Sequence, residues 1–430
     1  MTTPASDGGG APAPGGAGDR RQAAMPFILI AVLIDMVSIG VIVPVLPALI
    51  GQFATDPADH ALWVGVVSFA FGLANFFGAP ILGALSDRYG RRPVLLLGFC
   101  GLALNFFATA AATALWMLVA VRLVGGAMQA NAAVANAYVA DISAPEERAK
   151  RFGMLGAMFG LGFIVGPAMG GLLGAIDLRL PFVVAGSLAL LNLAYGYFVL
   201  PESLPPERRR AFEWKSANPI NSLRALSELK GIGRLVAVIA CTGLAQGVLY
   251  NCWVLYSTFK FGWTTLDNGW SLAAVGVVSV FVQGWLLGQL LKRFTPQRLA
   301  VLGLTSSMLA YAAWGAAPAG WVMYVVIFVN LLGFTVSASI QSIVSSAADA
   351  RSQGQTMGAV SSLNSLTAVI APAIGVPMLG MVSHLPQGHW GIGAPLYFGA
   401  ALQGLALWLA SSHFRRQADA TRADSLRPAN

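Results

Sequence analysis

Residues 26–50 read PFILIAVLIDMVSIGVIVPVLPALI, an apolar run that contains one charged side chain, Asp35. A stretch of this length and composition is long enough to cross a bilayer as a helix. A helix suits that solvent because its backbone polar groups are satisfied within the segment. The run therefore predicts a membrane span.

The rest of the chain has the same character. Of its 430 residues, 56% are hydrophobic and 10% are charged, whereas a soluble domain carries about a quarter charged residues. We expect an all-α membrane protein with twelve spans, and an even number puts both termini on one side. The runs lie at 26–50, 62–84, 94–113, 115–137, 152–175, 181–200, 236–257, 268–291, 299–317, 321–345, 354–382 and 394–413.

The basic residues indicate which side the termini occupy. Of the 26 Lys and Arg residues, 23 fall in the tails and in loops on the side of the termini. Arg179 and Lys260 lie on the opposite side, and Arg122 lies within a span. Basic residues accumulate in cytoplasmic loops, so we expect cytoplasmic termini. The net charge of +8 then reflects topology and not nucleic-acid binding.

The spans divide into two similar halves. Gly83 and Gly153 fall 205 residues before Gly288 and Gly358. This constant offset indicates a duplication, and parallel repeats place a substrate site near the midplane between the halves. We expect a disordered tail at 1–24, a six-helix half at 25–200, a cytoplasmic linker at 201–235, a second half at 236–413 and a tail at 414–430.

The loop after the second span reads GALSDRYGRR at 83–92. It resembles the signature loop of the major facilitator superfamily, which implies the major facilitator fold and a cytoplasmic latch between the halves. Asp87 can sit against a helix N-terminus or an Arg, and Asp141 is the expected charge partner of the latch. An ordinary basic loop is the alternative. The expected gate residues are Gly83, Asp87, Arg88, Gly90, Arg91, Arg92 and Asp141.

The fifth span contains GFIVGPAMGG at 162–171. It resembles the glycine–proline motif of the antiporter branch of the same superfamily. Gly162, Gly166 and Gly170 recur every four residues and form one smooth helix face. Pro167 lacks a backbone donor and favours a bend, and Gly171 ends the motif. Packing alone would explain the glycines, so exchange instead of import is implied by the resemblance only.

A narrower resemblance is to the tetracycline-efflux branch of the drug:proton antiporters. It rests on residues 35–47, 118–126, 137–143, 147–149, 200–203 and 362–367. It implies a multi-pass protein of the bacterial inner membrane that exports amphiphilic drugs against protons and functions as a monomer. Pumps of this branch carry further intramembrane charges where this chain has Asn105, Ser279 and Ser307, which puts tetracycline itself in question.

Two charged residues inside spans are expected to couple protons to transport. Asp35 lies in the first span, where the ionised form of a carboxylate is disfavoured, so it can take up and release a proton. Arg122 is expected to favour the charged form of that acid. A structural ion pair between the two is the alternative.

Polar side chains within apolar spans could line a wet cavity or merely join helices. The expected cavity residues are Asn75, Gln129, Asn131, Gln283 and Asn364. The histidines have no Cys, Ser or Asp at catalytic or metal spacing, and no phosphate-binding glycine loop occurs. We therefore expect no enzyme activity, metal or cofactor. A facilitator or importer of a metabolite or sugar, and a sensor that has lost transport, stay open.

Overall fold

The computed structural model describes residues 17–54, 56–129, 131–143, 147–211, 233–347 and 353–425. Within these ranges eleven helical stretches are long and apolar enough to cross a membrane. A pair of helices bent by 52°, Gly320–Val329 and Leu332–Val344, makes a twelfth. The prediction of an all-helical protein with twelve spans is confirmed.

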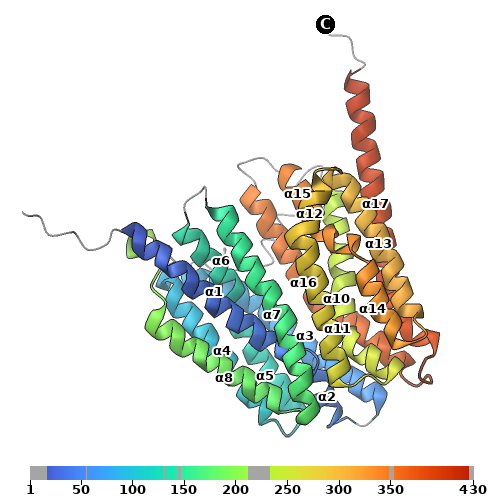
Figure 1. Cartoon of the computed structure of the whole chain (residues 1–430), viewed down its shortest axis with the longest axis horizontal. Coiled ribbons are helices and arrows are strands. Elements are labelled where there is room, and N and C mark those ends of the chain that lie inside the picture. Colours follow the sequence, from blue (N-terminus) through green and yellow to red (C-terminus); the bar gives the residue numbers. More distant parts are fainter. Residues whose placement is uncertain are drawn as a thin grey trace, which may run out of the picture.

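The first half contains spans one to six (Figure 1). Span one is broken near Pro44, and span four is broken after Met128. Its helices are α1 (Ala17–Ile42), α2 (Leu46–Gly51), α3 (Pro57–Tyr89), α4 (Arg91–Ala110), α5 (Leu115–Met128), α6 (Asn131–Ile142), α7 (Arg148–Ile176) and α8 (Leu180–Val199).

The second half repeats this plan with its own irregularities. Span eight contains a π-helical turn, η2, and span ten bends at a short 3-10 turn, η3. Its elements are α10 (Gly233–Phe261), α11 (Thr265–Phe281), η2 (Val282–Leu286), α12 (Leu287–Leu291), α13 (Pro296–Ala316), α14 (Gly320–Val329), η3 (Leu332–Thr335), α15 (Val336–Ala347), α16 (Gln353–Val382) and α17 (Ala394–Ser425).

Local sequence explains where several helices begin. Asp56 caps α3 by accepting hydrogen bonds from the backbone of Ala58 and Asp59, and Pro57 occupies the first helical position. Thr264 and Asp267 form a reciprocal capping box at the start of α11. These caps satisfy backbone donors that a helix terminus leaves without intrahelical partners.

The two tails differ from expectation at their inner ends. Helix α1 begins at Ala17, so residues 17–24 are helical instead of belonging to a disordered tail. Helix α17 continues to Ser425, and Figure 1 shows it extending beyond the bundle. The predicted tail residues 1–16 and 426–430, and residues 212–232 of the predicted linker, lie outside the described part of the chain.

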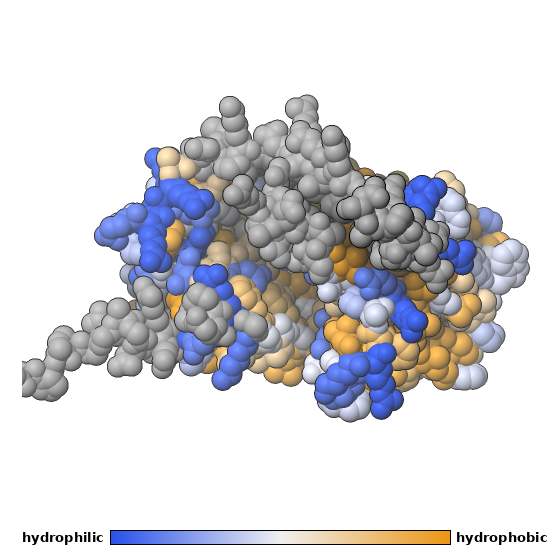
Figure 2. All heavy atoms as spheres, turned by 90° about the horizontal axis from the view of Figure 1, so that it is seen from above, coloured by the Kyte–Doolittle hydropathy of each residue, from blue (hydrophilic) through white to orange (hydrophobic). Residues whose placement is uncertain are grey.

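The bundle has two unlike ends. We call the end where α1 begins and α17 finishes the terminal side, and the opposite end the far side (Figure 1). The halves contact each other mainly through two helix pairs, α3 with α16 and α7 with α11. Seen from the terminal side, hydrophilic residues gather at several places on both halves, and apolar residues are visible between them (Figure 2).

The buried apolar residues show where the halves are joined. One cluster contains residues of both halves, among them Leu49 and Val64 from the first and Trp253 and Leu379 from the second. Toward the terminal side there are two separate clusters, one within residues 25–200 and one within residues 235–410. The core is therefore continuous on the far side and divided on the terminal side.

Candidate functional site

Asp35 lies inside the first half with 3% of its surface exposed. Its Oδ1 accepts a hydrogen bond of 2.8 Å from Nδ2 of Asn131, the first residue of α6. The surrounding pocket is lined mainly by apolar side chains, including Val32 and Phe99, and the free space is too small for a water molecule. The structure thus places an acid in a dry apolar site, which is costly for an unpaired charge.

The glycine face of α7 packs against the stretch of α1 that follows Asp35. A Cβ on Gly166 would lie 2.7 Å from Cα of Gly40, and one on Gly170 would lie 2.8 Å from the carbonyl carbon of Val41. A Cβ on Gly162 would come closest to Met36 and would lie 3.1 Å from the backbone nitrogen of Val37. Small residues let helix backbones approach in this way. The predicted smooth face therefore exists, and it packs against the helix that carries Asp35.

The opposite face of α7 contacts the second half. A Cβ on Gly171 would lie 3.0 Å from Cα of Gly269, and one on Gly269 would lie 2.6 Å from the carbonyl oxygen of Pro167. Helix α7 therefore packs both against α1 and against α11 of the other half. A movement of α1 at Asp35 can reach the interface between the halves through this one helix.

Arg122 lies on α5, and 8% of its surface is exposed. Within the described ranges it forms no ion pair with Asp35: the carboxylate takes the amide of Asn131 instead. The guanidinium carbon is 5.7 Å from the ring centre of Phe71. The structure therefore does not bring together the two charged residues expected to couple protons.

The break in span four explains why two predicted cavity residues have other roles. Asn75 donates to the carbonyl oxygens of Gln129, at 2.6 Å, and Gly126, at 3.4 Å, where α5 ends. It thereby satisfies carbonyls that a helix end leaves unpaired. Asn131 is buried against Asp35. Asn131 is thus buried, whereas Asn75 is half-buried and also supports the end of α5.

The other predicted cavity residues retain accessible surface. Gln129 is half-buried beside the break. Gln283 is exposed in the π-helical turn and donates to Oγ of Ser279 at 2.6 Å. Asn364 is exposed on α16. Exposed amides at these depths of a span are consistent with a polar surface inside the protein instead of a lipid contact.

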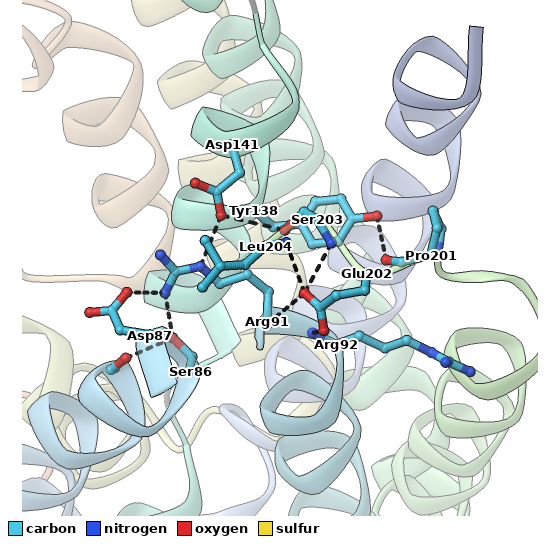
Figure 3. Close-up of polar contacts among 11 residues, drawn as sticks. Ser86, Asp87, Arg91, Arg92, Tyr138, Asp141, Pro201, Glu202, Ser203 and Leu204 are labelled. Atoms are coloured by element: carbon cyan, nitrogen blue, oxygen red, sulfur yellow. Dashed lines mark hydrogen bonds and ion pairs between the residues drawn. The ribbon is translucent and has the colours of Figure 1, made fainter. Parts of the chain in front are cut away.

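Arg91 joins two acids at the terminal end of the first half (Figure 3). It contacts Asp87 at 2.6 Å and Asp141 at 3.0 Å, and its Nη1 also donates to Oγ of Ser86. Asp141, the charge partner expected from the sequence, contacts Arg91. All of these contacts lie within the first half, so no described contact forms the expected latch between halves.

Glu202, just beyond α8, completes this group, and sequence reasoning gave it no role. Its carboxylate accepts from the backbone N–H of Arg91 at 2.8 Å and of Arg92 at 3.2 Å, and so caps α4 (Figure 3). It also accepts hydrogen bonds from the backbone of Ser203 and Leu204 in its own segment.

We call Ser86, Asp87, Arg91, Asp141 and Glu202 the signature-loop cluster. The sequence LPES at 200–203, one of the stretches that resemble the tetracycline-efflux branch, contains Glu202.

The remaining gate residues surround this cluster. Gly90 has φ of 109°, a conformation that favours glycine, and Glu202 occupies the space where a side chain would lie. Arg92 donates to the carbonyl oxygen of Tyr197 at 2.5 Å, whereas Arg88 stacks over Tyr89. Gly83 lies within α3, and no described atom of a neighbouring segment lies within 4 Å of a Cβ built there. The predicted loop is therefore a tight turn at Gly90, and α3 has open space beside Gly83.

Comparison with known proteins agrees with this architecture. The family model of the Major Facilitator Superfamily matches residues 28–372. The chain is 36% identical to the "Tetracycline resistance protein, class C" of Escherichia coli, over 87% of this chain and 94% of that protein. It is 34% identical to the class D protein of Salmonella ordonez, over 86% of this chain and 93% of that one.

Solved structures show the same fold. A bacterial homolog of the human lysosomal transporter Spinster, in an inward-facing and unoccupied conformation, matches with a TM-score of 0.73 and 17% sequence identity. The match covers 93% of this chain and 99% of that one. The sequence, the twelve spans and these similarities together show that this multi-pass membrane protein belongs to the Major Facilitator Superfamily of transporters.

Proposed function

We propose that the chain is a proton-coupled exporter of amphiphilic compounds in the inner membrane of a bacterium, with both termini in the cytoplasm. The relatives named as tetracycline resistance proteins support export of a drug and make tetracycline the first candidate. The excess of basic residues on the terminal side supports the orientation. The burial of Asp35 is the observation that supports proton coupling.

Asp35 has the properties of a proton carrier. It is buried, has no cationic partner in the described ranges, and lies in a pocket that excludes water. An ionisable residue kept at this cost within the membrane is by default a functional candidate. In our proposal Asp35 is protonated when its pocket is dry and releases the proton when a different conformation admits water. Asn131 holds the carboxylate in place.

The structure represents one of the two states that such a cycle needs. Its core is continuous between the halves on the far side and divided on the terminal side. With the proposed orientation, this state is open to the cytoplasm and receives substrate there. Export requires a second state in which the terminal ends of the halves meet.

The helix pair α7–α11 indicates which residues meet in that second state. In this structure Gly171 lies beside Gly269, Ile164 beside Gly276, and Gly160 beside Val280. Each pair has residue numbers that add to the same value, because the two helices run antiparallel. Continuing that register toward the terminal side places Gly156 opposite Gly284.

Neither glycine has another described segment packed against it. A Cβ built on Gly156 or Gly284 meets no described atom of a neighbouring segment within 4 Å, and the same holds for Gly153 and Gly288. The π-helical turn η2 adds one residue to span eight at this point, which shifts the register so that Gly288 of α12 falls opposite Gly153. Helix α7 and span eight thus carry paired glycines beyond the point where they separate.

The other pair between halves has the same arrangement. Gly65 of α3 lies beside Val376 of α16, and Gly72 beside Val369. Continuing this register places Gly83, which has open space around it, opposite Gly358. The offset of 205 residues converts the pair Gly83–Gly358 into the pair Gly288–Gly153. Both closures are therefore related by the internal repeat, which supports alternating access between the two halves.

The proposal leaves tetracycline as a candidate to be tested. Asn105 donates to the carbonyl oxygen of Val121 at 2.8 Å, and Ser279 accepts from Gln283. Ser307 is buried in α13. Where the resembling pumps carry charges, this chain thus has neutral side chains, two of them engaged in local hydrogen bonds. A different amphiphile is compatible with the same proton site.

The test is drug accumulation in cells that express the chain, with a panel that includes tetracycline, before and after an uncoupler. We expect lower accumulation of at least one compound, reversed by the uncoupler. Transport that the uncoupler does not affect would indicate a facilitator. No transport of any compound by purified protein in liposomes would contradict export and favour a sensor.

A further inference from the structure

Arg122 carries a buried positive charge for which the described residues supply no ion-pair partner. Its Nε and Nη2 are enclosed and have no hydrogen-bond acceptor within the described ranges. Leaving a buried charge uncompensated costs several kcal/mol, so such a side chain is retained when something else supplies the missing charge. A guanidinium presents several donors in a planar fork that fits a carboxylate or another planar oxyanion.

Three amide side chains of the first half are engaged with groups other than Arg122. Asn75 occupies the carbonyl oxygens of Gly126 and Gln129. Asn105 occupies the carbonyl oxygen of Val121, the residue before Arg122. Asn131 holds the carboxylate of Asp35. None of these hydrogen bonds includes the guanidinium of Arg122.

Arg122 also lies where the two halves approach. Phe71 of α3 faces the guanidinium from the first half, and the next residue, Gly72, packs against α16 of the second half. The charge therefore lies beside an aromatic ring of the first half, next to the helix pair α3–α16 that joins the halves.

The second half presents accessible polar surface at this level. Tyr250 is 45% exposed, and Gln246, one turn earlier on the same face of α10, is also exposed. Asn364 of α16 is exposed near Gly243 of α10. Polar side chains accessible in the middle of a span are expected to face a cavity and not lipid. Because Nε and Nη2 of Arg122 are enclosed in the present structure, we expect a ligand in that cavity to reach the guanidinium only when the helices around it move.

We propose that Arg122 anchors a planar anionic group of the transported compound, a carboxylate or an enolate, while Phe71 contacts its apolar part. The substrate class is then an amphiphile with a single negative charge, because one guanidinium supplies one positive charge. This inference rests on the proposed transport function and deepens it. The rival role is that Arg122 acts through Asp35 in proton coupling.

The test is ligand binding to purified full-length protein in lipid nanodiscs, without a proton gradient. Matched acids and amides are used as probes, beginning with 2-naphthoate and its neutral isostere 2-naphthamide, followed by further aromatic carboxylate–carboxamide pairs. A hydrogen-bonded charge pair of this kind favours the acid by about tenfold or more. Equilibrium dialysis measures both members of each pair at the same pH.

Four variants separate the possible roles. In Arg122→Gln the preference for the acid is expected to disappear, and in Arg122→Lys it is expected to persist in weakened form. Arg298→Gln removes the same charge from an exposed position and should keep the full preference. Asp35→Asn should also keep it, because binding does not require the proton carrier.

The outcomes decide between the roles. Equal affinity for acid and amide in the wild type, failure of every pair to bind, or a preference that survives in Arg122→Gln would overturn the proposal. A preference lost in Asp35→Asn would assign Arg122 to the proton site instead. Failure of uncoupler-sensitive export alone would contradict the proposed function and leave this binding result unaffected.

Discussion

Gly171 of α7 and Gly269 of α11 meet backbone to backbone, so that a Cβ on Gly171 would lie 3.0 Å from Cα of Gly269. This contact between the halves lies on the far side, and the two helices separate beyond Gly160 and Val280. The contacts between α7 and α11 on the far side therefore define a register of facing residues. This register predicts which residues meet when the terminal ends of the two helices approach.

That register makes a cross-linking prediction. With Cys100, Cys241 and Cys252 replaced, the pair Gly156→Cys and Gly284→Cys should form a disulfide during turnover, because closure brings the two positions together. A disulfide requires Cα atoms about 4.4–6.8 Å apart. Transport should stop on oxidation and recover on reduction. The shifted pair Gly160→Cys and Gly284→Cys is the control, and equal cross-linking in both pairs would contradict the register.

Substitutions at the packed and at the unpacked glycines of α7 should have different effects on stability. In Gly170→Ala the new methyl group would contact the backbone of Val41. Overpacking of this kind costs about 1–3 kcal/mol, more than the gain of about 1 kcal/mol from helix propensity. Gly156→Ala has open space and should be neutral or stabilising. Thermal unfolding of the purified variants measures both effects, and equal unfolding temperatures would refute this interpretation of the glycine face.

Glu202 should contribute to stability although its surface is exposed. Glu202→Ala removes a carboxylate that caps α4 and orders its own segment. Loss of a helix cap costs about 1 kcal/mol. Glu207→Ala, which changes an exposed acid five residues later, is the control. A similar thermal shift in both variants would show that charge alone, and not capping, accounts for the effect.

Two neighbouring arginines should differ in transport. Arg91→Gln leaves the carboxylates of Asp87 and Asp141 without their shared cation, whereas Arg88→Gln removes a side chain that stacks over Tyr89. We expect Arg91→Gln to slow transport by about tenfold, equivalent to roughly 1.4 kcal/mol in the limiting step. Initial rates of transport in liposomes test this. Equal rates in the two variants would show that the ion pairs of Arg91 do not affect the conformational cycle.

The twelve spans could be predicted because apolar length in a membrane protein is a local property of the sequence. The breaks were not predicted. Span four is interrupted after Met128, where Asn75 from another helix supplies the missing hydrogen bonds. A break that depends on a distant amide leaves no local signal. The π-helical turn at 282–286 was missed for a similar reason, since its sequence VQGWL is compatible with an ordinary helix.

The candidate site was predicted in part. Asp35 stands out because an acid in a long apolar run is rare and easily seen. Its partner Asn131 was selected only as one polar residue among several, and the contact between them connects positions 96 residues apart. The role of Glu202 likewise depends on a contact with α4 more than 100 residues earlier. Sequence spacing identifies residue types, whereas pairing between distant spans requires the packed structure.

The proton-carrier role of Asp35 is tested most directly in liposomes that contain purified protein and an exported compound. An imposed proton gradient should drive accumulation by the wild type and by Asp59→Asn, which changes an exposed acid at the start of α3. Asp35→Asn should lose gradient-driven accumulation and retain exchange of labelled for unlabelled substrate, because the site remains but the titrating group is gone. Undiminished gradient-driven accumulation by Asp35→Asn would contradict the account.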